Sequence, residues 1–191
     1  TPWYEAHIYW DGSLGICCQE SRQLSTDPQY NIRNMSLAEW FNSEPVRQFR
    51  IEMFNDTPGT DICSRCYHEA AHSGTSRRHR SNQKSVIFTK QAFNESFEQS
   101  PGYDHFMFSK GMDGLTGTLP IDLHIDLGNH CNLACKMCWP GASTTIASQY
   151  VKWGMDAKQY LGVDWTKDQT VWNRFLKDRK STRLNSSHTD I

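Results

Sequence analysis

The sequence predicts a mixed α/β fold, in which a small α+β domain is followed by the start of a β/α unit. Three observations support this class. Asp11-Gly12 separates two aromatic and apolar runs, which is a strong signal of a β-hairpin. Apolar residues then recur at helical spacing between residues 36 and 54. Residues 119–127 alternate apolar and polar, which predicts a strand, and a helical pattern begins at Ser143.

The two helices of the first domain have recognisable starting signals. Ser36 is followed three residues later by Glu39, which is the capping-box pattern and predicts a helix that begins directly after Ser36. Pro45 prevents this helix from continuing without interruption. We therefore expect Ser43 to cap a second helix, with Pro45 in its first turn.

The pattern is less regular beyond the second helix. Residues 57–59, Thr-Pro-Gly, end this helix, and the chain is expected to turn into residues 63–66 before a further helix. Residues 72–117 show no clear periodicity. Residues 165–177 predict an amphipathic helix, whereas residues 180–191 lack apolar periodicity and are expected to be a non-native or disordered tail.

These patterns divide the chain into two expected domains and the tail. The first domain, with a connecting segment, covers residues 1–112, and the second covers residues 113–179. The stretch from the strand to residue 179 has room for only one or two β/α units of ~30 residues each. A complete parallel β/α barrel needs more units than this, so we expect the chain to be a fragment that contains the first β/α unit or units of a truncated partial barrel.

Composition and charge limit the possible partners. The 191 residues are 37% hydrophobic and carry a formal net charge of −1. No basic field is present that would attract nucleic acid or an anionic membrane. No segment approaches the ~20 consecutive apolar residues of a membrane helix. We expect neither nucleic acid nor a membrane as a partner.

The seven cysteines fall into two groups. The first cysteine group is Cys17, Cys18, Cys63 and Cys66, and the second cysteine group is Cys131, Cys135 and Cys138. An odd count without an export signal argues against a secreted disulfide framework and favours metal binding. We therefore expect a reducing, cytoplasmic location.

The second cysteine group brings three thiols into one short loop directly after the predicted strand. Thiolates are the preferred ligands of iron–sulfur clusters. A four-iron cluster held by only three protein thiolates keeps one iron free to bind a small molecule. His130 precedes this loop and is expected to pack in it rather than bind metal. The sequence identifies no catalytic acid, base or nucleophile.

The residues of the first cysteine group are compatible with two kinds of site. A four-thiolate zinc site and a second iron–sulfur cluster both fit, and spacing does not separate them. Consecutive strand residues point to opposite faces, so Cys17 and Cys18 reach one site only where the strand ends or twists. The competing hypothesis for the whole chain is a non-catalytic module in which both groups bind zinc and present a protein-interaction surface.

The spacing Cys-x3-Cys-x2-Cys of the second group, framed by Gly128-Asn129-His130 and Trp139-Pro140-Gly141, resembles that of the radical S-adenosylmethionine (SAM) enzymes. The resemblance implies a catalytic [4Fe–4S] cluster whose open iron binds SAM, with Met137 near the adenine. Reductive cleavage of SAM would then give a 5′-deoxyadenosyl radical, with flavodoxin or ferredoxin as the reductant. The family's glycine-rich SAM-binding motif has no counterpart, so we do not expect this chain to turn over as it stands.

The segment from residue 2 to residue 80 resembles the twitch-type module, a short relative of the SPASM domain. Pro2-Trp3, the hairpin, the Cys17-Cys18 pair and Cys63-x2-Cys66 carry the resemblance. It implies that the first cysteine group binds an auxiliary [4Fe–4S] cluster for electron transfer or substrate anchoring. In similar proteins another cysteine precedes the Pro-Trp pair, so one of Cys17 and Cys18 can be a bystander. Relatives with such modules often modify peptides, which makes a peptide or protein the expected substrate.

Overall fold

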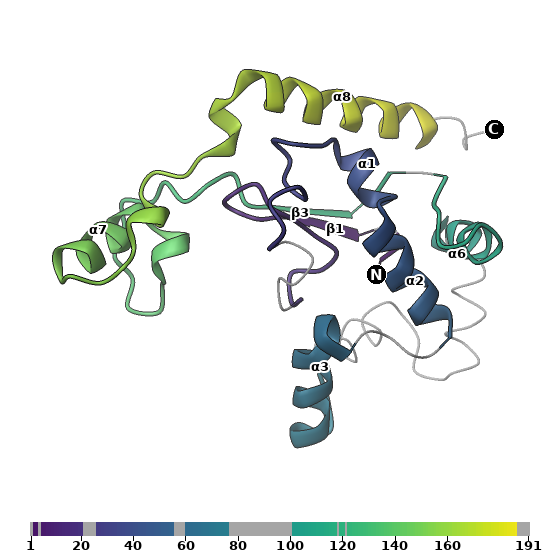
Figure 1. Ribbon diagram of the computed structural model, residues 1–191, viewed down its shortest axis with the longest axis horizontal. Coiled ribbons are helices and arrows are strands. Elements are labelled where there is room, and N and C mark those ends of the chain that lie inside the picture. Colours follow the sequence, from purple (N-terminus) through teal and green to yellow (C-terminus); the bar gives the residue numbers. More distant parts are fainter. Residues whose placement is uncertain are drawn as a thin grey trace.

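The protein is described by a computed structural model that covers residues 2–3, 5–20, 26–55, 60–76, 101–117, 119–120 and 122–186. Its fold is mixed α/β, as the sequence predicts, with a sheet of strand order β2-β1-β3 and helices around it (Figure 1). The strands are β1 (Glu5–Ile8), β2 (Leu14–Gly15) and β3 (Asp122–Ile125). The α-helices are α1 (Leu37–Phe41), α2 (Glu44–Phe54), α3 (Thr60–Ser73), α6 (Pro101–Gly111), α7 (Thr144–Lys152) and α8 (Gln169–Ser186). Three short 3-10 helices, η1 (Pro140–Ala142), η2 (Lys158–Tyr160) and η3 (Trp165–Lys167), complete the described elements.

The predicted hairpin is confirmed, because β1 and β2 pair antiparallel. Its turn is closed by the N–H of Tyr9, which donates to the carbonyl of Ser13 at 2.9 Å. Gly12 has a φ of +84°, a conformation that glycine adopts without steric strain. The strand β2 ends at Gly15, so Cys17-Cys18 lies beyond the strand and is free of the strict alternation of faces.

The strand β3 pairs in parallel with β1, which places segments far apart in sequence side by side. His7 lies opposite His124, and Ile8 lies opposite Ile125. β3 is shorter than the predicted strand of residues 119–127. The sheet therefore contains the hairpin of the predicted first domain together with the opening strand of the predicted second domain.

One face of the sheet packs against α1, α2 and α8. Ala6 and Ile8 of β1 alternate with polar residues, and their side chains are fully buried. The helices and the loops beside them contribute the rest of a continuous core. The core residues are Ala6, Ile8, Leu14, Ile16, Ile32, Leu37, Trp40, Phe41, Val46, Phe49, Trp165, Val171 and Phe175. The core thus extends from the hairpin to the last described helix.

The predicted helix starts are confirmed. At α1, the Ser36 hydroxyl accepts the N–H of Glu39 at 3.2 Å, and the Glu39 carboxylate accepts the N–H of Ser36 at 2.7 Å. The helix α2 begins after Ser43 with a proline in its first turn, but the Ser43 side chain makes no capping hydrogen bond, so only the position of this start agrees with the prediction. The helix α7 begins after Ser143, whose hydroxyl accepts the N–H of Ile146 at 3.4 Å.

Arg50 of α2 is completely buried and ties three segments together. Its guanidinium donates to the carbonyls of Pro2 at 2.7 Å, Phe41 at 2.7 Å and Gly114 at 2.9 Å. The same group lies 4.4 Å above the centre of the Phe41 ring. Burial lowers the pKa of Arg50 to about 9, so the guanidinium remains charged at neutral pH.

Two predictions about helices need correction. Cys63 and Cys66 do not lie in a loop: α3 already begins at Thr60, so both are helical. The last amphipathic helix starts at Gln169, preceded by η3, and α8 runs to Ser186, so residues 180–186 are helical. The turn expected at residues 57–59 and the end of the tail lie outside the described residues.

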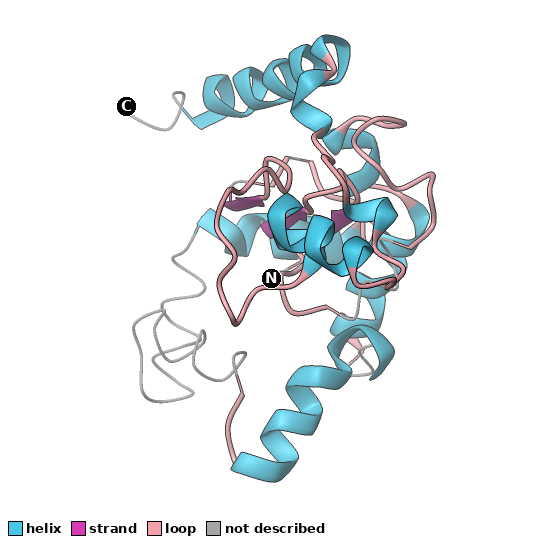
Figure 2. Cartoon of the chain, turned by 90° about the vertical axis from the view of Figure 1, so that its left-hand side faces the viewer, coloured by secondary structure: helices cyan, strands magenta, loops and turns pink. Residues whose placement is uncertain are grey.

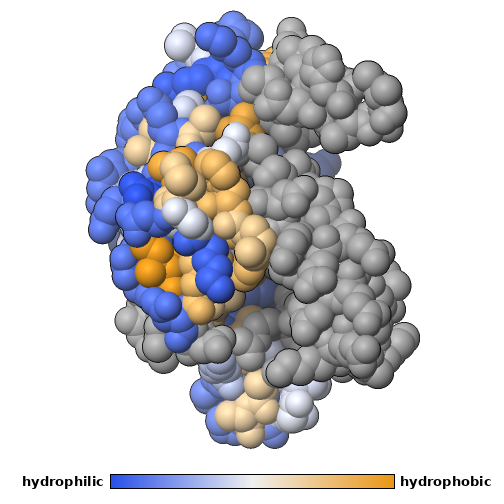
Figure 3. Space-filling view, turned by 90° about the vertical axis from the view of Figure 1, so that its right-hand side faces the viewer, coloured by the Kyte–Doolittle hydropathy of each residue, from blue (hydrophilic) through white to orange (hydrophobic). Residues whose placement is uncertain are grey.

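α3 projects from the body formed by the sheet and the other helices (Figures 1 and 2). Ile62 and Cys63, near its start, pack against the core. On the side where α6 lies, apolar side chains are interspersed with polar ones at the surface (Figure 3), and Met107 and Phe108 of α6 are exposed. In the described part of the chain, every helix is too short or too polar to cross a membrane.

Candidate metal centre

The loop that carries the second cysteine group follows β3 and is held firmly at its base by Asn129. This residue is buried, and its side-chain amide donates to the carbonyl of Tyr160 at 2.5 Å. Its Oδ1 accepts the N–H of Val163 at 3.0 Å, and its carbonyl accepts the N–H of Thr144 at 2.9 Å. Asn129 therefore joins the start of the loop to α7 and to the segment before η3.

Hydroxyl groups at the start of α7 hold the cysteine segment itself. Thr145 donates to the carbonyl of Cys131 at 2.9 Å, and Ser143 donates to the carbonyl of Leu133 at 2.8 Å. The N–H of Leu133 also donates to the sulfur of Cys131 at 3.4 Å. Contacts of this kind between a backbone N–H and a cysteine sulfur are typical of cluster-binding loops.

The tip of this loop is open to solvent. The N–H of Cys138 donates to the carbonyl of Cys135 at 3.0 Å, which forms a tight turn between them. Cys135 is exposed, whereas Cys131 and Cys138 are half-buried. Met137 has 95% of its surface exposed, so its side chain is accessible to a ligand bound at the tip. The structure thus brings the three predicted cluster ligands into one accessible loop.

Two glycines are required where this segment packs tightly. Gly128 has a φ of +128°, and a Cβ there would lie 2.8 Å from the carbonyl oxygen of Val163. A Cβ at Gly141 would lie 2.2 Å from the Trp139 ring. The backbone on both sides of the second cysteine group therefore follows a path that other residues cannot take without displacement.

Aromatic contacts connect the hairpin turn to the end of the second cysteine group. The ring centroids of Trp10 and Trp139 lie 6.0 Å apart. Tyr160 completes the group, with centroid distances of 5.4 Å to Trp10 and 5.6 Å to Trp139. The loop after β3 is thereby packed on the turn that joins β1 to β2.

Two residues of the first cysteine group lie against the core. Cys17 and Cys63 are both half-buried and both pack against the core. Cys66 follows Cys63 by three residues on α3, so the two side chains share one helix face. Cys18 is half-buried, and the side-chain amide of Gln19 contacts its sulfur at 4.0 Å.

The surroundings of Cys17 disfavour the charged form of its thiol. Burial raises the pKa of Cys17 to about 12, and the negative charge of Glu5 acts in the same direction. The N–H of Gln19, which donates to the Cys17 sulfur at 3.4 Å, only partly offsets this effect. A positive metal centre would have to displace the proton before the sulfur could bind.

Neither cysteine group is gathered around a single point. Across the described residues, which include all the cysteines, ligand atoms of three residues lie within 4.8 Å of one another at His7, His124 and Asp126 and not at the cysteines. Thiolates on one tetrahedral zinc would lie about 3.8 Å apart. In a four-iron cluster each thiolate binds a different iron, which allows wider spacing.

His130 directly precedes Cys131, and its side chain contacts Lys167 and Asp164. Its Nε2 is 3.1 Å from the ammonium of Lys167 and 3.8 Å from the carboxylate of Asp164. The pKa of Asp164 is lowered chiefly by hydrogen bonds from Thr166. His130 thus joins a polar group at the start of η3, in line with the packing role expected from the sequence.

Comparison with known families gives one result. Residues 1–67 match the family model of the SPASM domain, described as an iron–sulfur cluster-binding domain. The match assigns iron–sulfur cluster binding to this part of the chain. It contains the whole first cysteine group and supports the predicted SPASM or twitch module, whereas the second cysteine group lies beyond it. None of the curated proteins and none of the solved structures matches the chain.

Proposed function

We propose that this chain is part of a radical SAM enzyme with two [4Fe–4S] clusters. The observation that carries the proposal is the loop after β3, in which one exposed and two half-buried thiols follow a firmly held base. The SPASM match supports it, because SPASM domains are found in radical SAM enzymes. Cys131, Cys135 and Cys138 would hold the catalytic cluster, with one iron free of protein ligands.

The residues of the loop fit this role. When bound, the cluster and SAM together supply the electron transfer that cleaves SAM reductively. The chain's own residues position the ligands: Asn129, Ser143 and Thr145 fix the backbone on which the thiols stand. Met137 is exposed at the tip and would contact the adenine of SAM.

The first cysteine group would hold the auxiliary cluster. Cys17 and Cys63 lie against the same core, and Cys18 and Cys66 are their neighbours in sequence. The cluster would transfer electrons or anchor the substrate, for which we propose a peptide or protein. A small reductant protein such as flavodoxin or ferredoxin would deliver the electrons.

Anaerobic reconstitution tests the two sites separately. We expect about eight irons and eight sulfides per chain, with a visible absorption band that bleaches on reduction. Cys135→Ala removes an exposed ligand and should lose about half of the iron, whereas Cys66→Ala should lose the other half. Colourless protein that binds zinc stoichiometrically would instead support the zinc-binding interaction module.

SAM binding distinguishes the catalytic cluster from the auxiliary one. In the Cys66→Ala variant only the second cysteine group keeps its cluster, and addition of SAM should change the electron paramagnetic resonance signal of the reduced protein. In Cys135→Ala the remaining signal should not respond to SAM. An unchanged signal in both variants would contradict the proposed function, even if both clusters assemble.

A further inference from the structure

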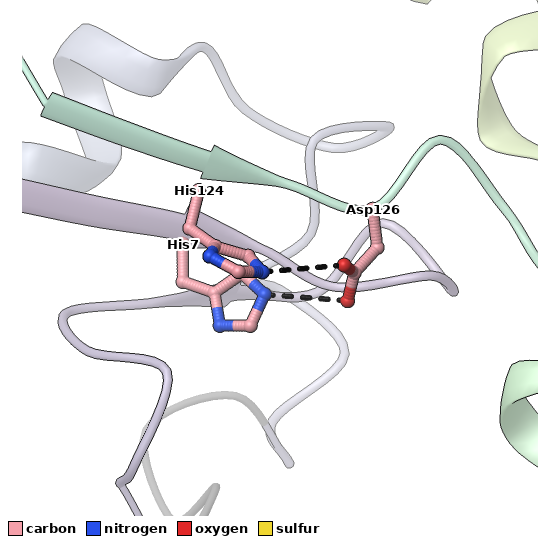
Figure 4. A group of neighbouring side chains, drawn as sticks. All are labelled: His7, His124 and Asp126. Atoms are coloured by element: carbon pink, nitrogen blue, oxygen red, sulfur yellow. Dashed lines mark hydrogen bonds and ion pairs between the residues drawn. The ribbon is translucent and has the colours of Figure 1, made fainter. Parts of the chain in front are cut away.

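The polar face of the sheet carries a group of three side chains outside both cysteine groups. His7 lies on β1, His124 lies on β3, and Asp126 follows the end of β3 (Figure 4). The parallel register places His7 opposite His124. Asp126 is two residues beyond His124, so both side chains emerge on the same face. The backbone pairing itself therefore brings the three together.

The distances between these side chains resemble those between ligands of one ion. Asp126 Oδ2 lies 3.3 Å from Nε2 of His7, and Asp126 Oδ1 lies 3.5 Å from Nε2 of His124. The contact between His7 and Asp126 is a hydrogen bond, but a long one, because charge-assisted N–H···O bonds measure about 2.7–2.9 Å. Ligands at about 2.0–2.1 Å from a tetrahedral zinc ion lie about 3.4 Å apart.

The burial of His7 also favours a metal site at this position. His7 is only 4% exposed, and its ring packs on that of Tyr9 with centroids 3.9 Å apart. Within the described residues its Nδ1 is buried without a hydrogen-bond partner. The other ring nitrogen, Nε2, faces Asp126, so the nitrogen that would bind an ion lies beside the other two proposed ligands.

The surroundings are open and negatively charged. The side chains of His124 and Asp126 are 56% and 37% exposed, so an ion can enter and water can complete its coordination. Glu5 and Asp122, which pair with each other in the same register, are two residues before His7 and His124 on this face. Their carboxylates add to the local negative potential that attracts a cation.

We propose that His7, His124 and Asp126 bind a divalent first-row transition-metal ion such as Zn²⁺ or Fe²⁺. Two imidazole nitrogens and one carboxylate oxygen suit such ions, and water would fill the remaining positions. The site contains no cysteine, so it is independent of both proposed clusters. The ion would tie β1, within the SPASM-matching segment, to β3, which leads to the second cysteine group.

Titration of the 191-residue chain with Co²⁺ tests this site, because the absorption spectrum distinguishes cobalt bound here from cobalt bound by the cysteines. Cobalt bound by thiolates gives intense charge-transfer absorption, whereas a nitrogen and oxygen site gives only weak d–d bands. We expect His124→Ala to bind one Co²⁺ per chain fewer than the wild type, with loss of d–d intensity and no loss of charge transfer. At this site the affinity should fall by at least about 100-fold.

Two further variants make the result decisive. Asp126→Asn keeps the side-chain shape but removes the charge, and it should lose the same ion. His68→Ala is the matched control, because His68 is an exposed histidine stacked on His72 of α3, with centroids 4.1 Å apart. It should retain the ion. Wild-type stoichiometry in both His124→Ala and Asp126→Asn, or loss of the ion in His68→Ala alone, would overturn the proposal.

Discussion

Among single residues, Cys17 shows the clearest effect of environment on reactivity. The thiolate is the form that reacts with alkylating agents, and the pKa of Cys17 is raised to about 12. In the metal-free, reduced chain at pH 8, iodoacetamide should therefore label Cys17 more slowly than the exposed Cys135. Peptide mass spectrometry over time measures both rates. Glu5→Gln removes a charge that raises this pKa and should speed labelling of Cys17. Equal rates for the two cysteines in the folded wild type would contradict the prediction.

The buried hydrogen bonds of Arg50 should contribute measurably to the stability of the fold. Arg50→Met keeps the apolar stem but leaves the carbonyls of Pro2, Phe41 and Gly114 without their buried donor. We expect the free energy of unfolding to fall by about 3 kcal/mol, measured by urea denaturation. Arg47→Met is the control, since Arg47 forms a more exposed ion pair with Asp113 and should cost less than about 1 kcal/mol. Similar losses in both variants would show that the carbonyl contacts contribute little.

Among the elements, α1 links stability to pH through its capping box. Hydrogen bonds from the backbone and side chain of Ser36 lower the pKa of Glu39. A lowered carboxyl pKa in the folded state means that the stabilisation is complete above the ordinary pKa of about 4.3 and is lost as pH falls through the lowered value. Urea unfolding between pH 3 and 6 should show this loss in the wild type and not in Glu39→Gln. Ser36→Ala should cost about 1 kcal/mol at pH 7.

The helix starts and the hairpin were predictable because their signals are local. Ser36, Ser143 and the turn at Gly12 act on residues within a few positions of themselves. The position of Cys63 and Cys66 inside α3 was predicted wrongly, since the preceding proline and glycine indicate a turn but do not fix where the next helix begins.

The proposed metal site at His7, His124 and Asp126 could not be predicted in the same way. Alternation within residues 119–127 does place His124 and Asp126 on one face. The partner of that strand is β1, however, and nothing local to either segment specifies their parallel pairing. Likewise, the spacing of the cysteines makes the loop of the second cysteine group evident. Its attachment through Asn129 was not predictable, because it depends on distant residues such as Val163, which follows Asn129 by 34 residues.

For the whole molecule, Trp165 connects the last helix to the sheet. Its side chain is fully buried, its indole N–H donates to the carbonyl of Asp126 at 2.8 Å, and its ring lies 5.8 Å from that of Phe175. Trp165→Ala should lower the free energy of unfolding by about 3–5 kcal/mol, measured by denaturant unfolding. Trp153→Ala, at a position 65% exposed, should change it by less than about 0.5 kcal/mol. Comparable effects would mean that α8 folds independently of the sheet.

The directions of the strands have a consequence for the two proposed clusters. β2 runs antiparallel to β1 and β3 runs parallel to it, so Cys17-Cys18 leaves the sheet at the end where β1 begins, and the loop of Cys131 leaves it at the end where β1 finishes. Four residues of strand at about 3.3 Å each separate these ends. The length of β1 therefore sets how far apart along the sheet the chain departs toward Cys17-Cys18 on one side and toward Cys131 on the other.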